Sequence, residues 1–251
     1  MTTTAPRDRP GHGRDSGARC AVIVFPGTWS DVDCHHVLST VFGVSADYVW
    51  HTESDLSQYD LAILPGGFAH GDHLRPGALA RFSPVMDGIR RMAEEGRTVI
   101  GICNGFQVLC EARLLPGALL RNAHLQYRCE WTNLRVETTN SRFTSLAEAG
   151  SVLRAPISHG DGNYFADDET IAELERTERI IFRYAGPEGA VTPEWNPNGS
   201  RGNIAGIVNE GRNVLGMMPH PERCCEPELG GVDGRAIFGS MLRHVGLPAT
   251  A

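Results

Sequence analysis

The chain has 251 residues, of which 23 are Lys or Arg and 30 are Asp or Glu, so its formal net charge is −7. No basic stripe runs along the sequence, which argues against a nucleic-acid partner. The longest apolar runs have the length of a strand and fall far short of a membrane span, so we expect no membrane partner either. A chain of this length buries about three quarters of its unfolded surface and needs no disulfide or metal to hold its core.

Residues 1–18 are polar and rich in Gly, Pro and Arg, and no long apolar segment follows them. We therefore expect a disordered tail rather than a signal peptide. The seven cysteines are scattered and odd in number, as is typical of reduced thiols in the cytoplasm. Zinc-ligand types occur in three short clusters, at 34–36, 70–73 and 224–225. None has paired Cys-x-x-Cys spacing, so we expect no metal site.

From residue 20 onward, short apolar runs typical of buried strands alternate with helical patterns. The strands expected in the first half are 20–27, 47–51, 61–67 and 98–102. The helices expected between and after them are 31–42, 75–95 and 105–115. This β-α-β-α order predicts an α/β fold with a mostly parallel open sheet and helices on both faces.

The second half of the chain has a different pattern. Two expected strands, 125–138 and 151–160, follow each other without a helix, which predicts an antiparallel extension of the sheet. The remaining expected elements are a helix at 167–178, strands at 179–185, 204–210 and 214–220, and a closing helix at 232–245. No repeat or linker follows residue 20, so residues 19–251 are expected to form a single domain.

Cys103 lies between two glycines in the segment GICNG, where an expected strand turns into an expected helix. Glycines at such a turn let the strand fold into the helix and expose the middle side chain at the edge of the sheet. The thiol would also face a helix N-terminus, whose partial positive charge favours the thiolate. The alternative is a small core residue, and the pentapeptide alone does not decide between the two.

A cysteine nucleophile needs an imidazole base and a group that orients it. The segment MMPHPER places His220 directly after an expected strand, with Glu222 two residues further on. A histidine after a strand is more often structural, but one flanked by prolines and followed by a carboxylate favours the role of base.

The segment LPGGF at 64–68 ends another expected strand. Its glycines can turn backbone N–H groups into a cleft, and the N–H groups of Gly67 and Asn104 are the natural pair for an oxyanion hole. Pro-Gly-Gly is also common in ordinary turns. The cysteine, histidine and glycine segments all fall at expected strand ends, where open α/β sheets build their sites.

These three motifs, in this order, resemble the class I (triad-type) glutamine amidotransferases, whose flavodoxin-like α/β fold agrees with the pattern above. A longer resemblance, from about residue 20 to residue 245, is to the glutaminase subunits of phosphoribosylformylglycinamidine synthase. The segments that carry it are VIVFPG, YVWH, LPGGFAHGDHLRPGALARF, GICNGFQVL, LLPGALLRN, SHGDGNY and GIVNEGRNVLGMMPHPER.

The resemblance implies that Cys103 is the nucleophile, His220 the base and Glu222 the acid that orients it. It implies oxyanion-hole or substrate-binding positions at Gly66, Gly67, Asn104, Gln107, His159 and Gly160. The implied reaction is attack by Cys103 on the side-chain amide of L-glutamine, loss of ammonia, and release of glutamate by water.

The chain has no GxxxxGK[ST] segment and no GxGxxG after a strand, so it lacks an ATP-binding signature. The resemblance therefore implies a large synthetase partner, often with a small third subunit, that uses ATP and Mg²⁺ to convert formylglycinamide ribonucleotide to its amidine. No cofactor is expected in this chain, and its expected location is the cytoplasm.

The sequence departs from the family at residues 28–31, which read Thr-Trp-Ser-Asp where Ser-Asn is usual, and at Pro76, where the family has Cys. Because the Trp29 loop lies where a partner could bind, the departure leaves the synthetase unidentified. One alternative is a relative that supplies ammonia in specialised nucleoside metabolism. A stand-alone cysteine hydrolase is a second, although such proteins lack the late His-Pro-Glu segment. A non-catalytic scaffold is a third, which the intact triad argues against.

Overall fold

The computed structural model describes residues 17–250. Of the disordered tail expected at residues 1–18, residues 1–16 lie outside the described residues. Both the tail and the single domain at 19–251 stay predictions. The large sheet is built from β1 (Cys20–Val24), β2 (Ala46–Trp50), β3 (Leu61–Leu64), β4 (Thr98–Ile102), β6 (Arg128–Val136), β7 (Val152–His159), β9 (Ile180–Ala185), β10 (Ile204–Val208) and β11 (Val214–Met217). A separate two-stranded sheet pairs β5 (Ala118–Leu120) with β8 (Asn163–Phe165).

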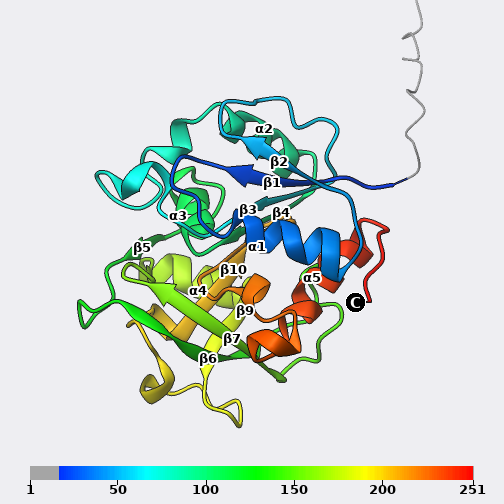
Figure 1. Cartoon of the computed structure of the whole chain (residues 1–251). Helices are drawn as coiled ribbons and strands as arrows, with labels where there is room; N and C mark the ends of the chain where they lie inside the picture. Colours follow the sequence, from blue (N-terminus) through cyan, green and yellow to red (C-terminus); the bar gives the residue numbers. More distant parts are fainter. Residues whose placement is uncertain (1–16, 251) are drawn as a thin grey trace, which may run out of the picture.

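The strands of the large sheet lie in the order β2-β1-β3-β4-β11-β10-β9-β6-β7 (Figure 1). Neighbours from β2 to β11 are parallel. Each pair from β11 to β7 is antiparallel. The predicted fold class is therefore confirmed: a parallel sheet is continued by an antiparallel extension.

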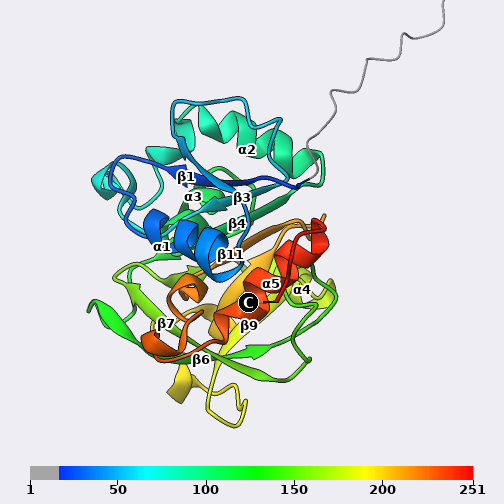
Figure 2. The ribbon, with the colours of Figure 1, turned by 45° about the vertical axis from the view of Figure 1, so that its right-hand side comes forward.

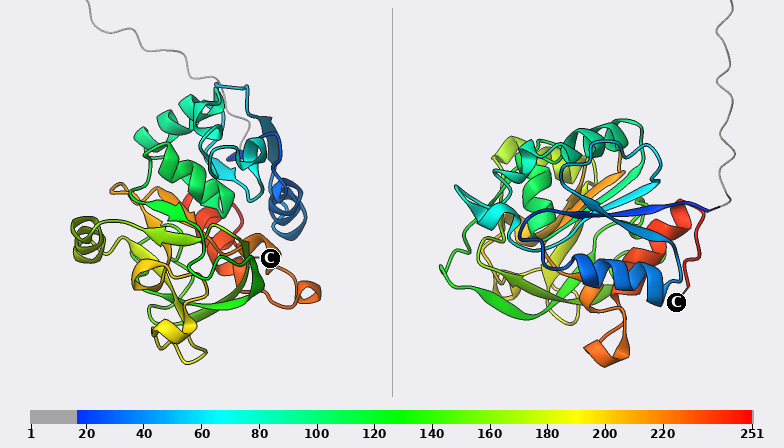
Figure 3. Two further views of the ribbon diagram at one scale, coloured as in Figure 1. Left: turned by 90° about the vertical axis from the view of Figure 1, so that its left-hand side faces the viewer. Right: turned by 45° about the horizontal axis from the view of Figure 1, so that its top comes forward.

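Helices cover both faces of the sheet, as predicted. On one face lie α1 (Asp31–His36), which continues into the π-helical turn η1 (Val37–Val41), and α5 (Gly234–His244) (Figure 2). The left panel of Figure 3 shows α2 (Val85–Glu94) and α3 (Asn104–Glu111) on the other face. Every residue of β3 and β4 is buried, as parallel strands require when both faces are covered.

A fifth α-helix, α4 (Asp168–Arg176), lies near the C-terminal end of α3, and residues along α4 and at that end of α3 line a common cavity of about 930 Å³. The Asp167 side chain caps this helix by accepting a hydrogen bond from the Thr170 N–H at 2.8 Å. This start agrees with the helix expected from residue 167, and Asp168 and Glu169 in its first turn suit the positive end of the helix dipole.

Several expected boundaries were wrong, including those of two helices and one strand next to the predicted motifs. The helix expected over 75–95 is only α2, preceded by a short 3₁₀ turn at Ala80–Phe82, because Ser83 precedes a proline and takes an extended conformation. The helix expected over 105–115 ends at Glu111, since Arg113 has a left-handed φ of 58°. The strand expected over 214–220 ends at Met217, so residues 218–220 form a loop.

The β5–β8 sheet was not predicted, because three-residue strands show no readable alternation. None of the helices within residues 17–250 has the length and apolar character that a transmembrane span requires.

The carboxyl ends of β3, β4 and β11 meet at one edge of the sheet. Leu64 is in register with Gly101, and Met217 with Ile102. The segments that follow these strands contain the glycine pair, Cys103 and His220, so the parallel register alone brings the three predicted motifs together.

Gly105 fixes how closely α3 approaches β3. A Cβ at this position would lie 2.0 Å from the carbonyl oxygen of Leu64, well inside van der Waals contact. The first turn of α3 therefore rests directly on the end of β3.

We predict that Gly105→Ala destabilises the protein even though alanine favours helix formation. The favourable helix propensity is about 1 kcal/mol, whereas overpacking against a backbone carbonyl destabilises by about 1–3 kcal/mol or more. Chemical denaturation measures the difference. Gly231→Ala is the control, because its nearest neighbours would lie at an ordinary 3.6 Å. Equal stability of Gly105→Ala and the native chain would contradict the close contact.

Candidate active site

Cys103 lies at the sharp turn between β4 and α3. Its backbone has φ 51° and ψ −105°, a conformation that residues with a Cβ rarely adopt. The Cys103 N–H donates to the Met217 carbonyl at 2.8 Å, and its Sγ lies 3.7 Å from the Ser158 carbonyl oxygen. Such strain persists only where the surroundings enforce it, and it concentrates at functional sites. The side chain is only 6% exposed, so the thiol is covered in this conformation.

His220 and Glu222 form a buried pair beside this turn. His220 Nδ1 lies 2.6 Å from Glu222 Oε1, and the residues are 3% and 1% exposed. Burial by itself lowers the pKa of His220, but the negative charges of Glu222 and Cys103 and hydrogen bonding outweigh it and raise that pKa to about 10. The imidazole therefore holds its proton when both of these neighbours are ionised, which is the charge state that a cysteine–histidine pair requires.

The other ring nitrogen of His220 is free for a reacting group. Nε2 is buried and makes no hydrogen bond to a nitrogen or oxygen atom within residues 17–250. The backbone of Gly66 packs against the ring, since a Cβ on Gly66 would lie 2.7 Å from His220 Cε1. Gly66 therefore leaves the room that the imidazole occupies.

Gly67 and Asn104 present backbone N–H groups at the same edge. Gly67 has φ 149° and pairs with Thr28 in an isolated antiparallel bridge. The hydrogen bonds that flank this bridge come from Trp29 and Phe68, so the N–H of Gly67 points away from the paired segment. The N–H of Asn104 is one of the unpaired donors at the start of α3. Neither N–H donates to another atom of the described residues, as an oxyanion hole requires.

The side chain of Gln107 points into an internal hydrogen-bond chain. Its Nε2 donates to the Asp161 carbonyl at 2.7 Å, and its Oε1 accepts from Asn104 Nδ2 at 2.9 Å. Asn104 Nδ2 also donates to Asp72 Oδ1, at 3.2 Å. The predicted contact of Gln107 with bound glutamine stays a prediction. The sequence analysis missed Asp72, whose only signal was a carboxylate within a glycine-rich loop.

His159 lies close to the triad and is neutral. Burial, and secondarily the charge of His220, lowers the pKa of His159 to about 3. Its Nδ1 lies 3.2 Å from Asn122 Oδ1. The Gly160 carbonyl accepts from the Asn122 N–H at 2.8 Å, which holds the segment after β7 in place. The predicted binding role of Gly160 stays a prediction.

The other cysteines have different surroundings. Burial raises the pKa of five thiols, those of Cys20, Cys34, Cys110, Cys224 and Cys225. Cys129 is exposed. Within residues 17–250, no three His, Cys, Asp or Glu side chains are grouped as metal ligands.

Comparison with known proteins places the chain in a family. Residues 17–230 match the model of the CobB/CobQ-like glutamine amidotransferase domain. The phosphoribosylformylglycinamidine synthase subunit PurQ of Moorella thermoacetica is 57% identical over 221 residues, which cover 88% of this chain and 94% of that protein. The chain belongs to the PurQ family of glutamine amidotransferases. The PurQ subunit of Salinibacter ruber is 53% identical, over 92% of this chain and 99% of that protein.

Solved structures agree with this membership of the PurQ family, which confirms the predicted resemblance. A chain in the structure of PurLQS from Thermotoga maritima has a TM-score of 0.81 and 41% identity, covering 91% of this chain and 99% of that one. A putative GMP synthase subunit from Thermoplasma acidophilum has a TM-score of 0.60 at 17% identity and shares the fold, covering 91% of this chain and 94% of that one.

We predict that Glu222→Gln lowers the pKa of His220 by about 1–3, the usual effect of an adjacent opposite charge. Without the Glu222 charge, the effect of burial on the pKa of His220 is less opposed, and the imidazolium formed during catalysis loses its carboxylate partner. Turnover should fall on the order of 100-fold or more, because the orienting carboxylate acts in the transition state. NMR titration of the His220 ring and steady-state kinetics measure the two effects.

The matched control is Glu226→Gln. Glu226 lies four residues further on and bonds His36 at 2.8 Å, outside the triad. A raised Michaelis constant with unchanged turnover in Glu222→Gln would instead make Glu222 a substrate-binding residue.

Proposed function

We propose that this chain is a glutaminase subunit that hydrolyses L-glutamine to glutamate and ammonia and passes the ammonia to a phosphoribosylformylglycinamidine synthase in purine biosynthesis. The observation that carries the proposal is the buried His220–Glu222 pair, which lies at the same sheet edge as the strained Cys103. The chain's 57% identity with a PurQ subunit supports a role in the purine pathway rather than that of a stand-alone hydrolase.

The geometry supports a thioester mechanism. Cys103 attacks the carboxamide carbon of glutamine, and the resulting oxyanion accepts hydrogen bonds from the N–H groups of Gly67 and Asn104. The protonated His220 gives its proton to the departing nitrogen, so that ammonia leaves and a glutamyl thioester remains. His220 then takes a proton from water, whose oxygen attacks the thioester and releases glutamate and the thiol. Glu222 holds the His220 ring throughout and stabilises it whenever it is protonated.

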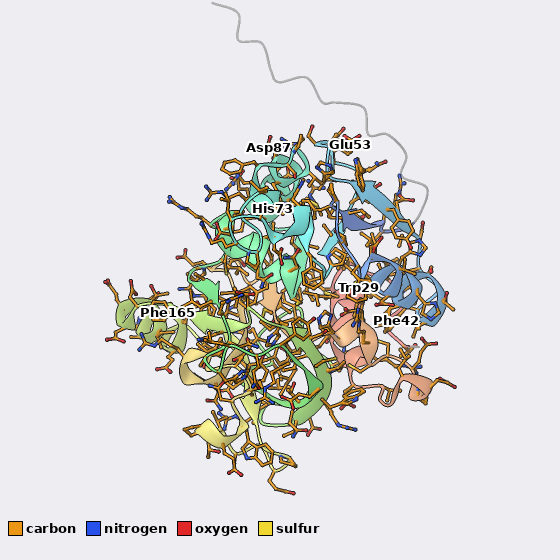
Figure 4. All side chains as sticks on the ribbon, turned by 60° about the vertical axis from the view of Figure 1, so that its left-hand side comes forward. Trp29, Phe42, Glu53, His73, Asp87 and Phe165 are labelled. Atoms are coloured by element: carbon orange, nitrogen blue, oxygen red, sulfur yellow. The ribbon has the colours of Figure 1, made fainter. Side chains whose placement is uncertain are left out.

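The ammonia needs a consumer, and the mouth of the site offers a surface for one. Trp29, Phe68 and Leu74 are 63%, 42% and 87% exposed, and the rings of the first two lie 6.2 Å apart. All three lie on the loops that follow β1 and β3, and large exposed apolar side chains on loops beside a site are typical of protein interfaces. Figure 4 shows Trp29 and His73 of this region, with Phe165 at another edge of the molecule.

We infer that a synthetase docks on this apolar surface. In Thermotoga maritima the similar chain is part of a structure of PurLQS. In our proposal, ATP and Mg²⁺ bind to the synthetase partner rather than to this chain. A small third subunit completes the complex, which works in the cytoplasm. Trp29, which departs from the family pattern, lies on the docking surface and therefore contributes to the choice of partner.

Separating ammonia production from ammonia use tests the proposal. Cys103→Ala should abolish glutamine-dependent amidine synthesis by the assembled complex, because the thioester cannot form. Synthesis from added ammonium chloride should survive, since the ATP-dependent step lies on the partner. The experiment measures amidine formation with each nitrogen source, and gel filtration checks assembly. Loss of both activities in a complex that still assembles would contradict the supplier role.

A further inference from the structure

The loop that follows the glycine pair is strained. Over residues 69–74, His70, Asp72 and Leu74 have φ angles of 54°, 51° and 71°, the left-handed region that residues with a Cβ avoid. Three such residues within five positions need contacts that hold them. The conformation of the loop is therefore fixed by contacts with the rest of the protein rather than by the preferences of its own residues.

The side chain of Asn104 anchors the loop. Its Oδ1 accepts from the Ala69 N–H at 3.0 Å, and its Nδ2 donates to Asp72 Oδ1 at 3.2 Å and to Gln107 Oε1 at 2.9 Å. The amide is thus held on three sides, and two of its three partners belong to the strained loop. Asn104 is also the residue whose backbone N–H faces the oxyanion in the proposed reaction.

Asp72 is the polar side chain through which the loop holds Asn104. Asp72 is half-buried, and it forms no ion pair with a cationic side chain of residues 17–250. Burial raises the pKa of Asp72 to about 6, the charge of Asp161 acts in the same direction, and the hydrogen bond from Asn104 opposes both. Above that pH the carboxylate is ionised, and a charged acceptor forms a stronger hydrogen bond than a neutral one.

The far end of the same loop is open to solvent. Leu74 is 87% exposed and belongs to the apolar surface described above, and His73 beside it is exposed as well. A partner seated on Leu74 contacts a segment whose other end is tied to the first residue of α3. The loop therefore connects the docking surface to the oxyanion hole by a continuous set of contacts.

We propose that Asp72 is a positioning residue of the glutaminase site. It holds Asn104 so that the Asn104 N–H points at the oxyanion, and it carries the effect of partner docking from Leu74 to that N–H. The inference rests on the proposed function, because the oxyanion arises only in acyl transfer.

Two substitutions of Asp72, compared in the assembled complex, test the proposal. Asp72→Ala removes the acceptor and should lower kcat about 10- to 100-fold with little change in the Michaelis constant for glutamine, somewhat less than direct loss of an oxyanion donor. Asp72→Asn keeps an oxygen acceptor and should retain most of kcat above pH 7. The native complex should lose kcat as the pH drops through about 6, and Asp72→Asn should abolish that fall.

Asp87→Ala is the matched control, because Asp87 is an exposed carboxylate on α2. It should leave kcat and its pH profile unchanged. Unchanged kcat in Asp72→Ala, or an effect on the Michaelis constant alone, would overturn the positioning role.

A readout without glutamine separates this inference from the proposed function. In the ¹⁵N-labelled chain, the Asn104 amide resonance should titrate with a midpoint near pH 6, and Asp72→Asn should abolish that titration. His70 and His73 lie on the same loop, so this variant is needed to assign the effect to Asp72. Asp161→Asn should move the midpoint to lower pH, because the charge of Asp161 raises the pKa of Asp72.

The outcomes are distinct. If the Asn104 amide titrates with Asp72 but the assembled complex has no glutaminase activity, the contact stands and the proposed function is refuted. If the protein hydrolyses glutamine, but substitution of Asp72 changes neither the Asn104 amide resonance nor kcat, the positioning role alone is refuted.

Discussion

The buried charge of Glu222 is the constraint on which the rest of the site depends. A carboxylate that is 1% exposed loses its hydration, and only a strong partner compensates for that loss. His220 is that partner, at 2.6 Å, while Glu222 Oε2 has no hydrogen-bond partner within the described residues. Replacing such a pair with apolar side chains is often neutral or stabilising. The His220–Glu222 pair is therefore better explained by a role in catalysis than by a contribution to the free energy of folding. It maintains an imidazolium beside Cys103, whose thiolate needs one.

The parallel register supplies the second half of the arrangement. The three segments that build the site are separated by tens of residues, yet β3, β4 and β11 end at one edge because they are parallel neighbours. Cys103 is held in an unfavourable backbone conformation by hydrogen bonding to Met217 in the next strand. In this conformation the thiol is covered and Gln107 is engaged internally. In the proposed reaction, glutamine reaches the thiol only after a covering segment moves.

Much of this could be predicted from the sequence, because the signals are local. Runs such as CAVIV and TVIGI predict buried strands, and Gly-Cys-Gly spacing predicts the turn between β4 and α3. The order of the strands in the sheet decides which motifs lie together, and the β-α-β alternation limits the number of possible strand orders. The helix over 75–95 was wrong because the extended residue before Pro84 outweighed the helical pattern around it.

The rest could not be predicted, because it depends on side chains that meet only after folding. Asp72 and Asn104 are 32 residues apart, and no spacing rule connects them. The left-handed conformations of His70 and Leu74 likewise result from tertiary anchoring rather than from residue type. The neutral state of His159 follows from burial beside His220, which a sequence pattern does not show.

Affinity labelling with a glutamine-like chloroketone tests the central claim most directly. Peptide mapping should find the label on Cys103, with excess glutamine preventing it, because that thiol interacts with the His220 ring and lies at the turn that carries the Asn104 N–H. Exposed Cys129 serves as an internal standard for unspecific alkylation, which glutamine should not affect. Label on Cys129, Cys224 or Cys225 with Cys103 unmodified would contradict the assignment of the nucleophile and, with it, the account of the site.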